Sequence, residues 1–384
     1  MSKLIDKLVN KAIGILSRYK DRQEVKEYIS GIRSSQKKLK QSRSLTQAQE
    51  KEIQEFYTGL LGHPIPLEWH RFFYSRTGIY SKLYLPTSEY KTNIVGRLNV
   101  YPLKRAYTDK NLSDVFLPSA HQPRIYLKNM NGFYYYEGKA VSSQEALEKC
   151  RNLGDVIIKP SLSSRGMGVR VLHIREGRID NGNQTLEEVF KEYGSDFQLD
   201  ELVRQHKDMS ALNPTSINTI RLLTYRTGMD VRMVYSVIRI GRKGKTIDNE
   251  SAGGISTQIL PDGTLGKYAY GAPGNDRIEY TDCGVRLDGY RIPSYQDAVE
   301  KVKEYHLQFP FFNLMAWDIA IEEDGTPTLI EFNVTPDLSQ SANGPAFGEY
   351  TEEILKDAMS RKNTWSRIGA SAMWRMNVGS IHFK

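Results

Sequence analysis

Apolar residues near the N-terminus recur every three or four positions, which is the spacing of one helix face. The residues of this stripe are Leu4, Ile5, Leu8, Val9, Ala12, Ile13 and Leu16. Gly31, followed by Ser34 and Ser35, predicts a break in the helix. A second helical pattern covers 45–61, with Ser44 as its expected cap. Residues 1–61 therefore read as a helical segment.

Further along the chain, short runs of β-branched and other apolar residues predict strands. After Gly62 the composition shifts to prolines, aromatic residues and short apolar runs, up to about residue 150. The expected strands are 156–159, 169–174, 219–226, 231–240, 315–322 and 328–334, and the expected helices are 185–193, 297–305 and 348–359. This interleaving of strands and helices predicts an α+β or α/β core.

Composition and charge narrow the class of protein. Of the 384 residues, 39% are hydrophobic, which is enough to build a core. The N-terminus does not read as a signal peptide, and the sequence has no apolar run of about 20 residues that could span a membrane. Its two cysteines, Cys150 and Cys283, are far apart, so a reducing cytoplasm fits best.

The net charge of +8 is concentrated at the N-terminus. Residues 1–43 hold twelve Lys or Arg against four Asp or Glu, and the rest of the chain balances at 41 against 41. Because the body is neutral, the sequence does not favour a nucleic-acid-binding protein. Two interpretations of 1–43 stay open. The segment could contact an anionic membrane surface peripherally, at the inner face of the membrane, or its apolar stripe could pack on the core or on a second subunit.

Near the C-terminus, polar residues stand in two apolar strands that an Asp-Gly turn would fold into a hairpin. Glu331 and Asn333 lie two positions apart and so share one strand face, and the hairpin can bring Asp318 beside them. Two carboxylates and an amide oxygen make a ligand set that suits Mg²⁺ bridged to phosphates. The alternative is that these groups cap strand ends or pair with nearby lysines.

Lys159 ends an expected strand and is followed by a small, glycine-bearing loop that runs to Gly168. Such a loop can place an ammonium and several backbone N–H groups around phosphate oxygens. It is not a Walker loop, since it lacks the Gly-Lys-Ser/Thr ending before a helix. The alternative is an ordinary hairpin with a glycine-rich tip.

Taken in order, these motifs resemble the ATP-grasp superfamily, to which D-alanine–D-alanine ligases and glutathione synthetases belong. The resemblance is closer to the sugar-transfer-associated ATP-grasp family and covers roughly residues 70–350. It rests on Asp109-Lys110 before LSDVFLP, Lys159 with its loop, DELVRQH (200–206), LNPTSINTIRLLT, DNESAGGI (248–255), Asp318 and the closing LIEFNVTPDL.

The resemblance implies a role for each matching residue. Lys110 and Lys159 would contact the α- and β-phosphates, and Arg221, with Asn218 nearby, would hold the γ-phosphate and the developing acyl phosphate. The loop residues Ser163, Ser164, Gly166 and Gly168 would close over the phosphates, and Glu201, Leu202 and Val203 would form the hinge that reads adenine. Asp318, Glu331 and Asn333 would bind one or two Mg²⁺. The acidic ribose contact of the superfamily is not obvious here, and Gln205, His206 and Asp208 are its candidates.

The resemblance also implies a fold and a division of the chain. The fold would be an α+β ATP-grasp fold, in which two subdomains grip ATP, preceded by the helical N-terminal segment. We expect an N-terminal α/β region at 62–125, a small subdomain with the glycine-rich loop at 126–200, a large subdomain with the metal site at 201–360, and a tail at 361–384.

The activity implied is that of an ATP- and Mg²⁺-dependent carbon–nitrogen ligase, which joins a small carboxylate to an amine through an acyl phosphate. The family's name points to an amino acid and a sugar derivative, in cell-surface polysaccharide modification. A kinase that phosphorylates a hydroxyl is the alternative within the same fold. A non-catalytic nucleotide-binding or membrane-docking module is the alternative outside it.

Overall fold

The computed structural model describes residues 2–163, 166–179 and 184–364 of the chain. These residues divide into two compact units, each of which is described by itself. Residues 2–104, 311–314 and 337–364 make the helical unit, and residues 105–310 and 315–336 make the sheet unit. Among the described residues, no helix has both the length and the apolar character to cross a membrane.

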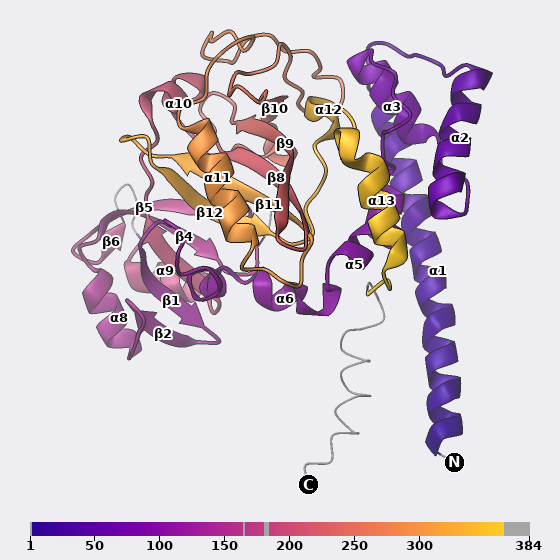
Figure 1. Cartoon of the computed structure of the whole chain (residues 1–384). Helices are drawn as coiled ribbons and strands as arrows, with labels where there is room; N and C mark the ends of the chain where they lie inside the picture. The colour runs from indigo at the N-terminus through magenta and orange to yellow at the C-terminus, as the bar shows by residue number, and fades with distance from the viewer. Residues whose placement is uncertain (1, 164–165, 180–183, 365–384) are drawn as a thin grey trace. The chain divides into compact units, whose positions relative to one another are not determined.

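The helical unit begins with α1, which extends over Ser2–Gln36 (Figure 1). Its other elements are α2 Gln47–Leu61, α3 Glu68–Thr77, α4 Thr87–Glu89, the π-helix η1 Tyr90–Ile94, α5 Val95–Leu98, η2 Tyr101–Leu103, α12 Gln340–Asn343, η5 Gly348–Tyr350 and α13 Thr351–Ser360.

Two details of the N-terminal helices differ from expectation. The first helix continues through Gly31 to Gln36, because Tyr28, Ile29 and Ile32 pack against a cluster of buried aromatic residues around Trp69. That packing outweighs the roughly 1 kcal/mol that a glycine costs inside a helix. The cap of α2 is Thr46 rather than Ser44, since Thr46 and Gln49 exchange two hydrogen bonds as a capping box.

The aromatic cluster of the helical unit encloses one histidine. His70 is 1% exposed, and its Nε2 donates to the carbonyl of Lys82 at 3.1 Å. Its Nδ1 is buried without a hydrogen-bond partner among the described residues. Burial therefore lowers the pKa of His70 from its ordinary value of 6.5 to about 4.

This histidine predicts a pH-dependent stability. A histidine whose pKa is lowered by folding stabilises the protein above pH 6.5, and that contribution is lost as the pH falls towards 4. We expect the free energy of unfolding to fall by about 3 kcal/mol across this range. Urea unfolding at several pH values measures it. His70→Gln should remove most of the slope, whereas the exposed control His121→Gln should leave it. A slope that persists in His70→Gln would contradict the assignment.

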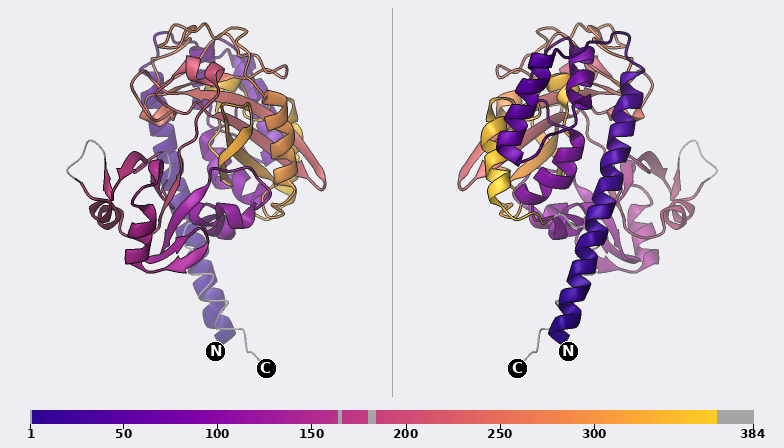
Figure 2. Two further views of the ribbon diagram at one scale, coloured as in Figure 1. Left: turned by 90° about the vertical axis from the view of Figure 1, so that its left-hand side faces the viewer. Right: turned by 90° about the vertical axis from the view of Figure 1, so that its right-hand side faces the viewer.

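The strands of the sheet unit, within the described residues, form two antiparallel sheets (Figures 1 and 2). The seven-stranded sheet has the order β3-β2-β1-β7-β4-β5-β6, and the five-stranded sheet has the order β10-β9-β8-β11-β12. The strands are β1 Ile125–Met130, β2 Phe133–Tyr136, β3 Lys139–Val141, β4 Gly154–Pro160, β5 Arg170–Arg175, β6 Arg178–Ile179, β7 Phe197–Glu201, β8 Ile220–Thr227, β9 Asp230–Ile240, β10 Ile255–Gln258, β11 Leu314–Ile321 and β12 Pro327–Asn333.

Helices cover one face of each sheet and leave the other face for the site (Figure 1). On the seven-stranded sheet, α8 and α9 pack their apolar residues against alternate residues of β4, β5 and β7, such as Val156, Leu172 and Leu199. On the five-stranded sheet, α11 contacts β8 and β9. The helices of this unit are α6 Lys104–Tyr107, which starts at the boundary between the units, η3 Lys110–Leu112, α7 Ser113–Phe116, α8 Ser143–Cys150, α9 Leu186–Tyr193, α10 Lys207–Leu212, η4 Glu250–Ala252 and α11 Tyr295–His306.

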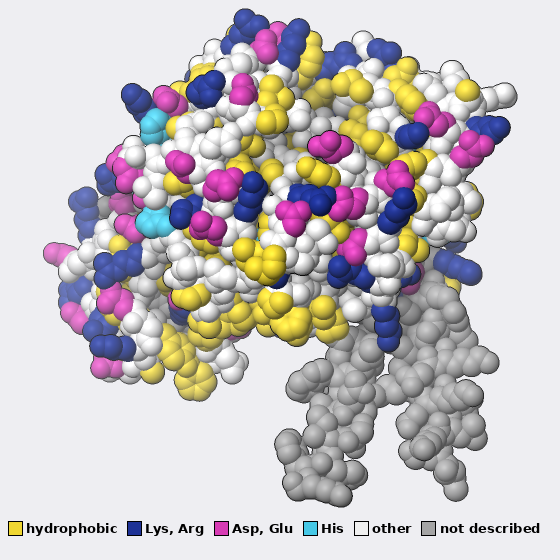
Figure 3. All heavy atoms as spheres, viewed as in Figure 1, with side chains coloured by type: hydrophobic (Ala, Val, Ile, Leu, Met, Phe, Trp, Pro, Cys, Tyr) yellow, Lys and Arg dark blue, Asp and Glu magenta, His cyan; other side chains and the backbone are white. Residues whose placement is uncertain are grey.

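The surface carries charges of both signs. In the space-filling view, Lys and Arg side chains are interspersed with Asp and Glu rather than gathered into one area (Figure 3). Exposed ion pairs such as Lys303–Glu300, at 2.9 Å, are part of this pattern.

Candidate functional site

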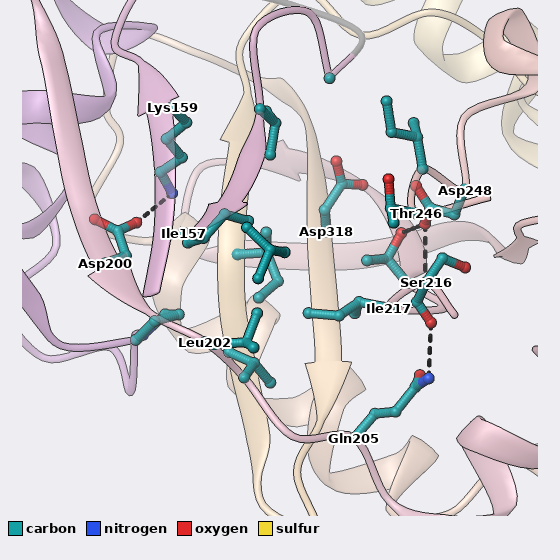
Figure 4. A pocket seen from close by; sticks show the side chains of 18 of the residues that line it. Ile157, Lys159, Asp200, Leu202, Gln205, Ser216, Ile217, Thr246, Asp248 and Asp318 are labelled. Atoms are coloured by element: carbon teal, nitrogen blue, oxygen red, sulfur yellow. Dashed lines mark hydrogen bonds and ion pairs between the residues drawn. The ribbon is translucent and has the colours of Figure 1, made fainter. Parts of the chain in front are cut away.

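A cavity of about 480 Å³ lies in the sheet unit, lined by residues of both sheets (Figure 4). It brings together many of the residues that the sequence singled out. Those in its lining are Lys110, Lys159, Ser163, Gly166, Glu201, Leu202, Val203, Asp318 and Glu331.

Lys159 reaches the cavity because side chains alternate along β4 and β7. Lys159 pairs in register with Gln198, and Ile157 pairs with Asp200, so these four side chains share the cavity face of the sheet. The opposite face presents Ile158 and Leu199 to the core. The Lys159 ammonium lies 2.6 Å from a carboxylate oxygen of Asp200, and Figure 4 marks this pair.

Lys110 is held at the start of η3, where Asp109 Oδ1 accepts a hydrogen bond from the N–H of Asn111. Its ammonium donates to the carbonyl of Ser163 at 2.5 Å and lies 3.8 Å from Glu331. Burial lowers the pKa of Lys110, an effect that the carboxylate of Glu331 opposes. A second cation thus faces the same space as Lys159.

The glycine-bearing loop between β4 and β5 borders the cavity, with Gly166 in the lining. Gly168 has a φ of +73°, and a Cβ there would lie 2.8 Å from Cγ of Pro160, so this position requires glycine. Ser163 donates from its hydroxyl to the carbonyl of Pro160 at 3.1 Å, which folds the loop back on its strand. Ser164, expected to contact phosphate, lies outside the described residues.

The β11–β12 hairpin pairs Asp318 directly with Glu331, and Ala316 with Asn333. The register shifts between Asp318 and Ile319, whose partner is Leu329, so β12 has a bulge at Ile330. Because of this bulge, the consecutive residues Ile330 and Glu331 both line the cavity. The Asn333 amide nitrogen lies 3.4 Å from Glu331 Oε1.

Two arginines hold Asp318, which is fully buried. Arg221 on β8 donates from Nε and Nη2 to the two carboxylate oxygens, each at 2.8 Å, and Nη2 of Arg239 on β9 lies 3.1 Å from one of them. Burial alone would raise the pKa of Asp318, but the two guanidinium groups hold it well below its usual value.

The hinge and several aliphatic side chains, among them Ile157 and Ile217, make the apolar part of the cavity. Glu201 ends β7, and Leu202 and Val203 follow it in the lining. In Figure 4, Ile157 lies between Asp200 and Asp318, and Leu202 and Ile217 lie below them in the view. An apolar slot beside a polar end is typical of a site for a flat, charged small molecule.

Six of the expected site residues are not in this lining, which is drawn from the described residues: Asn218, Arg221, Gly168, Asn333 and the ribose candidates His206 and Asp208. The Asn218 side chain is buried, and its amide donates to the carbonyls of Met209 and Asn213, each at 2.8 Å. Arg221 is turned to Asp318. Of the ribose candidates, Gln205 lines the cavity, but its amide nitrogen donates to the carbonyls of Asn213 and Ser216.

Sequence reasoning gave no role to several residues of the site, above all Arg239 and the segment 246–249, although Asp248 and Asn249 open the DNESAGGI run. The Arg239 guanidinium donates to Thr219 Oγ1 at 3.0 and 2.6 Å and to Asn249 Oδ1 at 3.0 Å. Asp248 is buried and accepts from the N–H of Thr219 at 3.1 Å. One signal in the sequence pointed to Arg239. It lies within an apolar strand, as Arg221 does.

The solved structures to which this chain is similar include three ligases. One is the L-amino acid ligase from Bacillus licheniformis, with 12% identity, a TM-score of 0.38, and coverage of 67% of this chain and 49% of that one. Another is the D-alanine–D-alanine ligase from Bacillus anthracis in complex with ATP, with 12% identity, a TM-score of 0.38, and coverage of 66% and 65%. The third is the D-alanyl-alanine synthetase A from Vibrio cholerae O1 biovar eltor, with 11% identity, a TM-score of 0.41, and coverage of 66% and 65%. The matched part is thus about half to two thirds of each of these proteins.

No curated protein matches the sequence. The model of the family described as sugar-transfer associated ATP-grasp matches residues 89–356, which is more than half of the chain. The expected α+β fold of the ATP-grasp type, preceded by a helical N-terminal segment, is confirmed. The chain belongs to the sugar-transfer-associated ATP-grasp family.

Proposed function

We propose that this protein is an ATP-dependent ligase that joins a carboxylate to an amine through an acyl phosphate. The observation that supports it best is the layout of the cavity. One part is an apolar slot beside the hinge. The other holds the cations of Lys110, Lys159 and Arg239, of which Lys110 lies 3.8 Å from Glu331 and Arg239 lies 3.1 Å from Asp318. This pattern suits a nucleotide whose base is apolar and flat and whose phosphates are charged.

In this proposal, adenine occupies the slot between Ile157, Leu202 and Ile217, where backbone groups of Glu201–Val203 read its edge. Lys110 and Lys159 neutralise the α- and β-phosphates, and the Ser163–Gly168 loop covers them. Arg221, to which the resemblance gives the γ-phosphate, is joined by Arg239, which lines the cavity. The ribose contact stays a choice among Gln205, His206 and Asp208.

The donor set at the β11–β12 hairpin fits Mg²⁺. Asp318 and Glu331 pair directly across the two strands, and the Asn333 amide nitrogen lies 3.4 Å from Glu331 Oε1. Two carboxylates and an amide oxygen on neighbouring strands are the oxygen ligands that Mg²⁺ prefers. Glu331 and Asn333 would hold the ion together with Asp318, whose charge the two arginines share. When bound, Mg²⁺ would offset the negative charge of the phosphates during transfer.

The reaction proposed has two steps. A carboxylate oxygen of the first substrate attacks the γ-phosphorus and ADP leaves, which gives an acyl phosphate. The nitrogen of the second substrate then attacks the acyl carbon, inorganic phosphate leaves, and the amine loses a proton. The protein's part is to position the groups and to neutralise charge, because phosphoryl transfer needs little covalent help. We propose an amino acid and a sugar derivative as the substrate classes, following the family's description.

Release of ADP in a substrate screen tests this function. The full-length protein with ATP and Mg²⁺ is offered pools of amino acids, uronic acids and amino sugars, with and without hydroxylamine. We expect ADP release that depends on an acid, formation of a hydroxamate with hydroxylamine, and an amide product when an amine is added. ADP release that depends on an alcohol and yields a stable phosphate ester would show a kinase instead. ATP binding without any turnover would favour a non-catalytic module.

A substitution in the loop tests the position of the phosphates. In Gly168→Ala, the new Cβ meets Pro160 and must displace the loop backbone, so we expect KM for ATP to rise about tenfold. The matched control is Gly154→Ala, which has nearly the same φ, +74°, but open space around its Cβ. It should cost about 1 kcal/mol of stability and leave KM unchanged. Equal KM values in the two variants would contradict the loop's role.

A further inference from the structure

A buried ion pair stands on the cavity face of the seven-stranded sheet. The carboxylate of Asp200 is 2% exposed and lies 2.6 Å from the Lys159 ammonium. The amide nitrogen of Gln198 donates to both carboxylate oxygens of Asp200, at 2.7 and 2.8 Å. One carboxylate is thereby fixed from the side of its own strand and from the neighbouring strand.

The side chain of Gln198 leaves one polar atom without a hydrogen bond in this arrangement. Its side-chain Oε1 is buried and has no hydrogen-bond partner within the described residues. A buried acceptor without a partner is unfavourable, and a leucine of similar size would avoid it. The gain from glutamine at this position therefore lies in its two hydrogen bonds to Asp200.

The neighbouring cation explains why Lys159 needs a fixed counter-ion. Lys110 faces the same cavity, and the charge of Lys159 is one of the causes, after burial, that lower the pKa of Lys110. Two ammonium groups in a partly buried space repel each other unless each has an anion. The carboxylate nearest to Lys110 in an ion pair is Glu331, at 3.8 Å. The carboxylate of Asp200 lies closer to Lys159, at 2.6 Å.

The binding of ATP would affect the carboxylates of Glu331 and Asp200 differently. In the proposed function Glu331 binds Mg²⁺, so Lys110 exchanges its partner when the nucleotide enters. Asp200 is on the other sheet and belongs to no metal set, so its pair with Lys159 can persist. An ammonium has three N–H bonds, of which the pair uses one.

We propose that Asp200, oriented by Gln198, is a positioning residue that fixes the Lys159 ammonium so that its remaining N–H bonds meet the phosphates of ATP. This inference rests on the proposed function, because it takes ATP as the ligand. Asp200 itself touches no phosphate in this arrangement. Its charge also acts weakly on Lys110, but its direct contact is with Lys159.

A double-mutant cycle on nucleotide binding tests the proposal. The affinity of the full chain for the non-hydrolysable analogue AMP-PNP, with Mg²⁺, is measured by calorimetry for the wild type, Lys159→Met, Asp200→Asn and the double variant. We expect each single substitution to weaken binding about 10- to 100-fold, since each removes a charge-assisted hydrogen bond. In the Lys159→Met background, Asp200→Asn should change the affinity less than about twofold. A cost that is the same in both backgrounds would overturn the proposal, because Asp200 would then act without Lys159.

The chain offers a matched control on the same sheet face. Lys128 pairs in register with Gln198, and its ammonium lies 2.6 and 2.7 Å from the two carboxylate oxygens of Asp114. This second pair lines another cavity, of about 410 Å³, and is not in the lining of the first. Asp114→Asn should leave the affinity within about twofold of the wild type. A loss equal to that of Asp200→Asn would show a general charge effect and overturn the proposal.

Gln198→Leu covers the case in which Asp200→Asn does not fold. It removes the two hydrogen bonds to Asp200 and the buried Oε1 without a change in charge. We expect a loss of about three- to tenfold in the wild-type background and none in Lys159→Met. An unchanged affinity in a folded Gln198→Leu protein would overturn the positioning role. If the wild type does not bind AMP-PNP, the proposed function fails as well, whereas tight wild-type binding without coupling refutes this inference alone.

Discussion

Replacing Glu331 by glutamine is expected to abolish ATP turnover, with a fall in kcat of about 1,000-fold or more. Glu331 lines the cavity, pairs in register with Asp318 on the neighbouring strand and has the Asn333 amide beside it. Glutamine keeps the shape but removes one of two anionic ligands from the proposed Mg²⁺ site, so the phosphates would lack their main source of neutralisation. Release of ADP over a range of Mg²⁺ concentrations measures the effect.

The control for this variant is Glu300→Gln, because Glu300 is exposed on α11 and neither it nor its ion-pair partner Lys303 is in the cavity lining. It should behave like the wild type. A thermal melt shows whether each variant is folded. If folded Glu331→Gln keeps wild-type turnover, Glu331 does not bind an essential metal ion.

Replacing Arg221 by methionine is expected to lower the free energy of unfolding by about 3–5 kcal/mol. Asp318 is fully buried, and the bidentate contact with Arg221 supplies two of its hydrogen bonds, each at 2.8 Å. Methionine fills a similar volume but leaves the carboxylate with Arg239 as its remaining cation on the neighbouring strands. Urea unfolding at neutral pH measures the loss.

The matched control is Arg232→Met on β9, where Arg232 pairs with Asp230 at 2.7 Å but the carboxylate is 56% exposed. That substitution should cost less than about 1 kcal/mol, because exposed pairs contribute little. Adding Asp318→Leu to Arg221→Met should restore part of the stability, since it removes a buried carboxylate that has lost its bidentate partner. A loss below 1 kcal/mol in Arg221→Met would mean that the Arg221–Asp318 pair does not stabilise the fold.

Patterns in the sequence predicted the strands and the hairpin, because these depend on residues that are close together along the chain. The alternation of apolar residues gave the strands now seen as β8, β9, β11 and β12 to within one or two residues. The Asp324-Gly325 pair predicted the turn of the β11–β12 hairpin. The register of the two strands follows from the burial of Phe332, which fixes the face of β12 that packs on the core. The two-residue spacing of Glu331 and Asn333 followed from the same alternation, as did their shared face.

The remaining features depend on contacts between residues far apart in sequence. The ion pair of Arg221 with Asp318 joins residues 97 positions apart and exists only because β8 lies beside β11. Asn218 turned inwards because the carbonyls of Met209 and Asn213 needed a donor, which no pattern in the strand reveals. The continuation of α1 through Gly31 likewise depends on the aromatic cluster around Trp69.

The bulge at Ile330 has a consequence for how this family of chains can vary. Upstream of the bulge, β12 presents Leu329 to the core. Downstream of it Glu331 lines the cavity and Asn333 shares its strand face, while Phe332 packs inwards. Loss of one residue between the turn and Glu331 would reverse that phase, so that Phe332 would enter the cavity and Glu331 the core. Insertions and deletions should therefore be tolerated in the exposed turn at Glu323-Asp324 but not in the four residues 327–330. In a collection of relatives, the distance in sequence from the end of the turn to the glutamate should be constant, even where the turn itself changes length.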